Sequence, residues 1–219
     1  MIEKNKIYDL SVPLYDNMPL FPGNIPLNIS KIAQPEKEGY GMESYSSSTH
    51  CGTHIDAQAH FIQGGQTVNK IPLDILINGG YVIRPEIEGL EISAETVKKL
   101  WKDKYNGKTI LIDTEWSEKR SYSTEFQERF PGLSPDAASF FVEKHVKLLG
   151  IDTLGIDPYT RSDLPSHKIL LNGGCSIIED LTNLKSLSTD IEYKIIALPL
   201  NLLNGSGSMA RVVAMEWHK

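Results

Sequence analysis

Short runs of aliphatic and aromatic residues, bounded by Gly, Pro or Asn, recur along the whole chain. Runs of this length that are rich in Ile, Val, Leu and Tyr predict β-strands, because such side chains fit a pleated and half-buried surface. The predicted strands are residues 7–12, 27–32, 81–84, 109–112, 153–156, 195–198 and 212–215. The hydrophobic pattern therefore predicts a strand-rich protein.

The clearest helical pattern runs from Pro135 to about Leu149. Ser134 precedes it as a suitable N-cap, Pro135 has the fixed φ that favours the first helical position, and Gly150 follows as a helix-ending residue. Its apolar side chains are spaced to pack against a sheet.

Two further helices are predicted from weaker patterns. One begins after Ser93, and a short one spans residues 163–172 and stops at a Gly-Gly pair. No repeat, low-complexity tract or Pro/Ser-rich linker divides the sequence. We therefore predict an α/β fold, with one strand-rich domain over residues 1–219 and a few flanking helices.

Composition and charge exclude several classes of function. The chain has a net charge of −6 and no basic cluster longer than a pair of residues, so a nucleic-acid partner is not expected. The first six residues lack the apolar stretch of a signal peptide, and the most apolar run, 195–200, is too short to span a bilayer. We expect a cytoplasmic protein without a membrane partner. With two cysteines and no C-x-x-C pair, any metal site must use nitrogen and oxygen ligands.

Residues 50–60 contain a dense set of side chains that bind metals. The stretch reads His50-Cys51-Gly52-Thr53-His54-Ile55-Asp56-Ala57-Gln58-Ala59-His60 and holds three of the six histidines. In an extended strand side chains alternate, so His50, His54 and Asp56 would face the same point. Gly52, on the same side, would leave room for an ion and its water, while residues 51, 53 and 55 would face a core. The pattern predicts a metal site.

Two other interpretations of this stretch are weaker. A helix would also bring His50 and His54 together at i and i+4, but it would turn Asp56 about 200° away, and the Glu that follows the first His in zinc proteases is missing. Three structural histidines in a core would not account for four ligand-type side chains at this spacing. The strand interpretation is therefore preferred.

Two His and one Asp leave the shell of an ion incomplete, so more ligands are expected elsewhere in the chain. His167 falls in the first turn of the short predicted helix, and Glu179 directly follows an apolar Ile-Ile pair. The residues alone leave open whether these two side chains bind metal or are ordinary solvated groups. His145, in a charged stretch, and His218, near the C-terminus, are interpreted as surface residues.

The 50–60 segment resembles the H-x-G-T-H-x-D-x-x-x-H signature of the cyclase family, which includes bacterial kynurenine formamidase and isatin hydrolase. The resemblance extends over nearly the whole chain. Further similar landmarks are Asp9-Leu10-Ser11, Pro19-Leu20-Phe21-Pro22-Gly23, Thr114 with Trp116, Phe130-Pro131-Gly132-Leu133-Ser134, Leu149-Gly150-Ile151-Asp152, Gly155-Ile156-Asp157 and Ala197-Leu198-Pro199-Leu200.

This resemblance implies a swivelling β/β/α fold and a homo-oligomer, either a dimer or a tetramer. It also implies two divalent metal ions per subunit, with zinc as the expected ion and manganese as the alternative, since His and carboxylate ligands suit both. His50, His54 and Asp56 would hold one ion, and Asp56 would also reach the second. His167 would bind the second ion, and Glu179 would bridge both.

The function implied by the resemblance is the hydrolysis of an amide bond in a small aromatic substrate, as in the arylformamidase step of tryptophan catabolism. The ions would lower the pKa of a shared water from 15.7 toward about 7, and His60 would act as the general acid and base that protonates the leaving nitrogen. Two alternatives remain: the opening of a cyclic amide or lactone, and a non-catalytic metal-binding protein.

The chain departs from the family pattern at three places. Gln58 replaces a proline usual between the Asp and the last His, which could change the turn that aims His60. Phe21 stands where kynurenine formamidases typically have a tryptophan, and it is the predicted substrate-binding residue. Residues 204–211 are longer and richer in Gly and Ser than the usual D-G-S-P turn, so we expect a flexible loop that covers the pocket.

Overall fold

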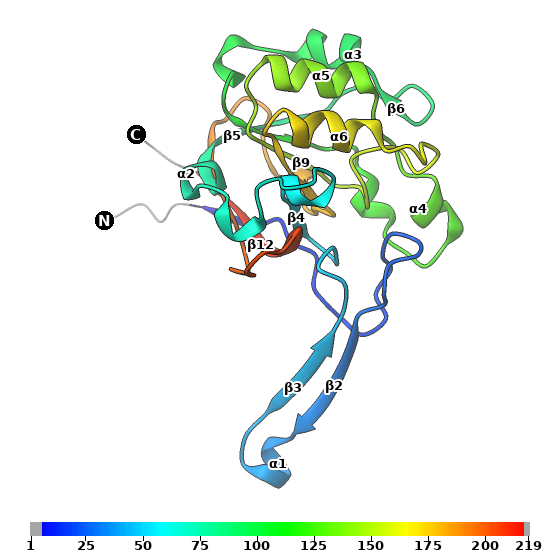
Figure 1. Cartoon of the computed structure of the whole chain (residues 1–219), viewed down its shortest axis with the longest axis vertical. Coiled ribbons are helices and arrows are strands. Elements are labelled where there is room, and N and C mark those ends of the chain that lie inside the picture. The colour runs from blue at the N-terminus through cyan, green and yellow to red at the C-terminus, as the bar shows by residue number, and fades with distance from the viewer. Residues whose placement is uncertain (1–5, 217–219) are drawn as a thin grey trace.

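One large sheet organises the chain, and the computed structural model describes residues 6–216 of it (Figure 1). The strands are β1 (Ile7–Asp9), β2 (Asn28–Ala33), β3 (Met42–Ser46), β4 (His54–Asp56), β5 (Ile77–Ile83), β6 (Glu91–Ile92), β7 (Thr109–Ile112), β8 (Gly132–Leu133), β9 (Leu148–Ile151), β10 (Ser176–Glu179), β11 (Tyr193–Pro199) and β12 (Gly207–Glu216). The α-helices are α1 (Pro35–Glu38), α2 (Leu73–Leu76), α3 (Ala94–Leu100), α4 (Thr124–Glu128), α5 (Pro135–Glu143) and α6 (Pro165–Asn172).

The large sheet closes on itself. Its order is β1-β12-β11-β5-β7-β9-β10-β4, and β4 also pairs with β12, so the seven strands from β12 to β4 form a ring with β1 attached outside it. The contiguous strands β5, β7, β9 and β10 run parallel, whereas β4, β11 and β12 join by antiparallel pairs. In β7, β9 and β10 every residue is buried, as expected for parallel strands covered on both faces.

Helices α3, α5 and α6 lie together over one outer face of the sheet (Figure 1). Alternate residues of β7 divide between the two sides: Ile110 and Ile112 belong to the core under these helices, and Leu111 belongs to the core inside the ring. The strand-rich α/β class and the swivelling β/β/α architecture are confirmed. Among the described residues, no helix is long and apolar enough to cross a membrane.

Strands β2 and β3 form a separate two-stranded sheet that projects away from the body of the protein, with α1 at its tip (Figure 1). All five residues of β3 are exposed, and in β2 only Ala33 is buried. We call residues 28–46 the arm.

The sequence predicted where helices begin better than where they end. Ser134 is an N-cap as expected, and Ser93 caps the helix that was predicted to begin after it; both hydroxyls accept hydrogen bonds from the amides of the third helical residues. The predicted 135–149 helix is wrong beyond Glu143, because His145 adopts a positive φ and the apolar residues that follow form β9. The predicted strand 153–156 is also wrong, and this segment bends beneath the candidate site.

Candidate metal centre

The five side chains predicted as metal ligands meet beside the strand that closes the ring. Strand β4 carries His54 and Asp56, and its antiparallel partner β10 places Glu179 opposite His54. Helix α6 supplies His167 from its first turn, and His50 lies just before β4. Because cross-strand partners share one face, the pairing of β4 with β10 brings Glu179 to the histidine cluster.

Asp56 lies at the middle of this cluster. Its Oδ1 is 2.7 Å from Nδ1 of His50 and 3.3 Å from Nε2 of His54. Its Oδ2 is 3.7 Å from Nε2 of His167. Glu179 completes the set, with Oε1 at 3.0 Å from Nε2 of His167 and Oε2 at 3.4 Å from Nε2 of His54.

Other protein groups fix the orientation of two of the histidines. Asp157 accepts a hydrogen bond of 2.6 Å from Nδ1 of His167 and also accepts from the backbone amides of Ser166 and His167. The Gly52 carbonyl accepts from Nδ1 of His54 at 2.8 Å. In each case the remaining nitrogen, Nε2, points to the carboxylates, as in metal sites where a second group fixes the tautomer. In the sequence Asp157 stood out only as a family landmark, although its place shortly before a helix start indicates a capping residue.

His50 is held differently, between β4 and the start of β12. Its Nε2 lies 3.1 Å from the hydroxyl of Ser206. A Cβ added to Gly207 would lie 2.5 Å from Cε1 of His50 and 2.6 Å from the carbonyl oxygen of Ile55. The absence of a side chain at Gly207 therefore makes space for the imidazole.

The cluster is suited to a cation. Nε2 of His54 and Oδ2 of Asp56 are buried without a hydrogen-bond partner, although buried polar atoms normally have one. Two sets of ligand atoms are close enough to hold an ion: those of His50, Asp56 and His60, and those of His54, Asp56 and Glu179. Two neighbouring carboxylates inside the protein also need positive charge, and a divalent ion would supply it.

Electrostatic interactions within the cluster are strong. Burial alone would lower the pKa of His54 and of His167, but the nearby carboxylates raise the pKa of His54 well above its usual range and that of His167 to about 10. Burial alone would raise the pKa of Glu179, yet His167 chiefly holds it at about 2. The carboxylates are thus ionised and attract positive charge into this site.

His60 lies at the edge of the cluster, at the end of the 3-10 turn η1 (Gln58–His60). Its ring stacks on His50 with centroids 3.9 Å apart, and its Nε2 is 4.0 Å from Oδ2 of Asp56. Burial lowers the pKa of His60 to about 4. The Gln58 amide donates to the Leu171 carbonyl of α6, so this residue anchors the turn where the family usually has proline.

A cavity of about 240 Å³ opens over the cluster. Phe21 lines it and packs edge-on against Phe130, with centroids 5.9 Å apart, so the predicted aromatic wall does border the site. The other residues that line it are Leu20, Asn24, Ser48, His50, Gly52, His54, His60, Phe61, Leu154, Gly155, Leu164, His167, Glu179 and Asp180.

Two sequence-based expectations about this region are wrong. The extended segment covers only His54–Asp56; Gly52 has a φ of 59°, and a Cβ there would meet Leu14 at 2.6 Å, so this glycine serves a turn and a close contact and does not make room for an ion. The expected flexible loop 204–211 leads directly into β12, whose backbone pairs with β4 and β11, and it does not line the cavity.

Two further histidines were interpreted as surface residues. His145 is exposed, as predicted, and has the positive φ that ends the α5 region. His218 lies outside the described residues. His145 is not part of the cluster.

Comparison with known proteins gives consistent results. A family model described as putative cyclase matches residues 8–158. A kynurenine formamidase of Bacillus cereus is 31% identical over 94% of this chain and 95% of its own length. Among solved structures, isatin hydrolase A from Labrenzia aggregata bound to benzyl benzoate has a TM-score of 0.84 and 26% identity over 98% of this chain and 94% of its own. A predicted metal-dependent hydrolase from Bacillus stearothermophilus has a TM-score of 0.82 and 28% identity over 98% of this chain and 100% of its own.

The fold and the cluster of His, Asp and Glu side chains define the class of this protein, which is that of the metal-dependent hydrolases. Within that class the chain belongs to the cyclase family, since the family model covers well over half of it and the formamidase relative matches nearly its whole length.

Proposed function

We propose that this protein hydrolyses the amide bond of a small aromatic substrate with two divalent ions held by His50, His54, Asp56, His167 and Glu179. The observation that carries the proposal is the pair of buried atoms without partners, Nε2 of His54 and Oδ2 of Asp56, at the centre of five converging ligand-type side chains. We expect zinc, with manganese as the alternative, because this ligand set suits both.

The chain's own residues would orient the substrate and move a proton. Bound divalent ions would supply a nucleophilic water with a pKa of about 7 and would polarise the carbonyl group. His60 is half-exposed at the cavity, and burial keeps its imidazole neutral at pH 7, so it can take a proton from water and hand it to the leaving nitrogen. Asp157 and the Gly52 carbonyl would keep His167 and His54 in the tautomers that bind through Nε2.

The substrate class rests on the cavity and on the relatives. A volume of about 240 Å³ with Phe21, Phe61 and leucine side chains in its wall suits a small flat ring. Kynurenine formamidases are relatives over almost the full length of the chain, so an N-formyl aromatic amine is our first candidate. The similarity to isatin hydrolase A favours a second candidate, the opening of a cyclic amide or lactone. We further propose that the enzyme is cytoplasmic and forms a homo-oligomer.

Metal analysis followed by a substrate panel tests the proposal. Purified protein would be stripped with chelator, reloaded with zinc or manganese, and assayed on N-formyl aromatic amines, isatin-like rings and lactones. We expect turnover of at least one class that is lost with chelator and restored by one of the ions. Tightly bound metal without turnover of any substrate would favour a structural metal protein instead.

A His60→Ala variant separates the role of His60 from that of the ligands. We expect the variant to keep its metal content and to lose most turnover, by about 10²–10⁴-fold, since this is the usual contribution of general acid-base catalysis. Loss of metal in the same variant would make His60 a ligand, as its distance to Asp56 also allows.

A further inference from the structure

Leu164 has an unusual backbone conformation at the edge of the cavity. Its φ of 46° and ψ of 54° lie in the left-handed region, which is sterically unfavourable for a bulky side chain. Six other residues besides glycine have a positive φ among the described residues, and five of them are Asn, Asp or His, the types that tolerate it best. Leu164 is the only aliphatic residue in this set. The backbone at this position is therefore strained.

Neighbouring groups hold the strained backbone in place. The Leu164 amide donates to the Arg161 carbonyl at 3.1 Å, and Pro165 occupies the first position of α6 with its fixed φ. Asp157 accepts a hydrogen bond of 3.0 Å from the amide of His167 in the same turn. Glycine or asparagine would take this conformation at less cost, so the strain points to a role for the leucine side chain.

Packing in the core does not supply that role. Leu164 is half-buried and belongs to none of the four hydrophobic clusters found in residues 6–216, whereas Leu154, which also lines the cavity, belongs to one of them. The Leu164 side chain lines the cavity together with Phe21 and Phe61. Its apolar surface is therefore available to an occupant of the cavity.

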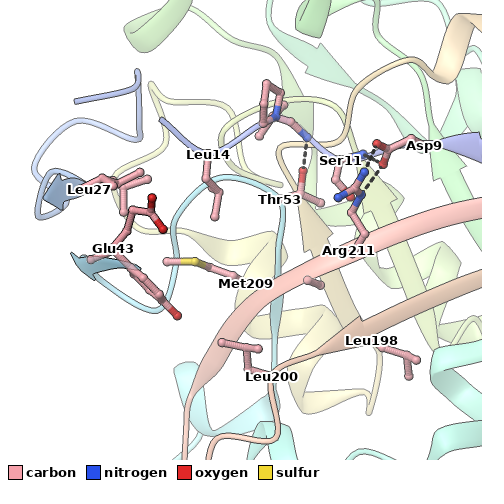
Figure 2. A pocket seen from close by; sticks show the side chains of 15 residues that line it. Asp9, Ser11, Leu14, Leu27, Glu43, Thr53, Leu198, Leu200, Met209 and Arg211 are labelled. Carbon is pink, nitrogen blue, oxygen red and sulfur yellow. Dashed lines mark hydrogen bonds and ion pairs between the residues drawn. The ribbon is translucent and has the colours of Figure 1, made fainter. Parts of the chain in front are cut away.

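The cavity is distinct from the wider hollow beside the arm. That hollow has a volume of about 910 Å³ and is lined by fifteen residues, among them Leu14, Leu198, Leu200 and Met209 (Figure 2). None of the fifteen lines the cavity over the metal ligands. A side chain that contacts a substrate bound at the metal centre therefore has to lie in the wall of the smaller cavity.

We propose that Leu164 determines which substrates fit, because it forms an apolar wall against which the aromatic ring of the substrate packs beside the metal centre. Leu164 directly precedes α6, whose first turn supplies His167, so the same helix positions the wall and a metal ligand. A ring that covers this side chain removes apolar surface of both groups from water, which stabilises the complex. This inference rests on the proposed function and adds to it a limit on the width of the ring.

Two kinds of substrate of different width test the role of Leu164. Formanilide has a single ring, and the N-formyl naphthylamines have two fused rings beside the same kind of amide bond. Leu164→Gly removes the wall and adopts the left-handed backbone without strain. We expect it to lower kcat/KM for formanilide by about tenfold or more, mainly through KM, since this is the usual cost of a lost apolar contact in a pocket. The ratio of kcat/KM for the naphthyl substrates to that for formanilide should rise by a similar factor.

Further variants separate this role from a structural one. Leu164→Met keeps an apolar wall and should restore the wild-type ratio. Leu100→Ala is the control, because Leu100 is 36% exposed at the end of α3 and does not line the cavity; it should leave the ratio unchanged. Leu164→Asn also tolerates the left-handed backbone, and it replaces Leu164→Gly if the glycine variant fails to fold. Leu164→Gly should keep its metal content and unfold within about 3 °C of the wild type, because relief of strain offsets the lost side chain.

A rise of the ratio in Leu164→Gly that Leu164→Met reverses, with metal content unchanged, would support the proposal. An unchanged ratio would overturn it. Loss of metal in Leu164→Gly would also overturn it, because Leu164 would then act by holding His167.

Calorimetry of formanilide binding to the metal-loaded protein distinguishes failure of this inference from failure of the proposed function. If the wild type turns over neither kind of substrate but binds formanilide, and Leu164→Gly binds it about tenfold more weakly, the proposed function fails while the wall is supported. If the wild type neither binds nor hydrolyses these compounds, both proposals are overturned.

Discussion

Replacing Gly207 by alanine should damage the metal centre without adding or removing a ligand. The added Cβ would lie 2.5 Å from Cε1 and 3.1 Å from Nδ1 of His50, and 2.6 Å from the carbonyl oxygen of Ile55. Both flanking strands are fixed, because β12 pairs with β4 at this position and β4 pairs with β10 on its other side. The imidazole is therefore displaced, and the contact with the Ile55 carbonyl oxygen adds strain to the pairing of β4 with β12.

The size of the effect follows from the overlap and from the role of His50. Forcing one extra methyl group into a packed site costs about 1–3 kcal/mol of unfolding free energy. A ring displaced from Asp56 and Ser206 loses its contacts at 2.7 and 3.1 Å. Loss of ligand orientation typically weakens metal binding about 10–100-fold, so we expect the affinity of Gly207→Ala for zinc to decrease by at least that factor.

The assay is a competitive titration of zinc against a chromogenic chelator, combined with thermal unfolding of the metal-free protein. Gly205→Ala is the matched control: the atoms nearest its added Cβ would be in the side chains of Leu202 and Val68, at 2.9 and 3.1 Å. The control should lose stability but keep its affinity for metal. In a His50→Ala background the Gly207 substitution should change affinity less, because only the contact with the Ile55 carbonyl oxygen remains. Wild-type affinity in Gly207→Ala itself would refute the argument that this glycine makes space for a ligand.

Three further outcomes are expected. Asp157→Asn should lower metal affinity by about 10–100-fold, measured by the same titration, because an amide no longer fixes the His167 tautomer, while its oxygen can still cap α6. Phe21→Ala should raise the Michaelis constant for the true substrate and leave metal content unchanged; an unchanged constant would remove this residue from the pocket. Burial raises the pKa of Asp152 to about 6, so the folded state favours its protonated form. The stabilisation of the folded state by the protonated Asp152 carboxyl is complete below about pH 4 and is lost as the pH rises through 6. The unfolding free energy of the wild type should therefore fall, relative to that of Asp152→Asn, by up to about 3 kcal/mol between pH 4 and 7. Urea unfolding measures this difference.

The sequence predicted the parts of the fold whose signals are local. Residues 109–112 form β7 as expected, because four consecutive apolar residues between polar ones are typical of a buried strand. Residues 148–156 show where such signals fail. Leu148 and Leu149 continue the apolar spacing of the preceding helix, but they fill β9, because a place between β7 and β10 requires a buried strand there. That requirement depends on strands far away in the sequence.

The ligands of the candidate site also divide into those that a local pattern predicts and those that depend on strands far away in the sequence. His54 and Asp56 are two residues apart on one short strand, so alternation alone placed them on one face. Glu179 meets them only because β10 pairs antiparallel with β4, in a register that joins positions 125 residues apart. No local pattern contains that register. Gly207 is a further example. Its importance lies in its contact with His50, whereas the sequence indicated only that Gly207 belongs to a flexible loop.

Strand β4 is both the element that closes the sheet and the element that carries the central carboxylate. It pairs with β10 on one side, which supplies Glu179, and with β12 on the other, which supplies the space over Gly207 for His50. The ligands on β4 and β10 would therefore bind the same ions, so metal binding would favour the pairing of these two strands and with it the closed ring over an open one. An ion that binds only the folded protein stabilises the folded state, and this stabilisation grows with the logarithm of the ion concentration divided by its dissociation constant. The metal centre and the closed sheet should therefore stabilise each other.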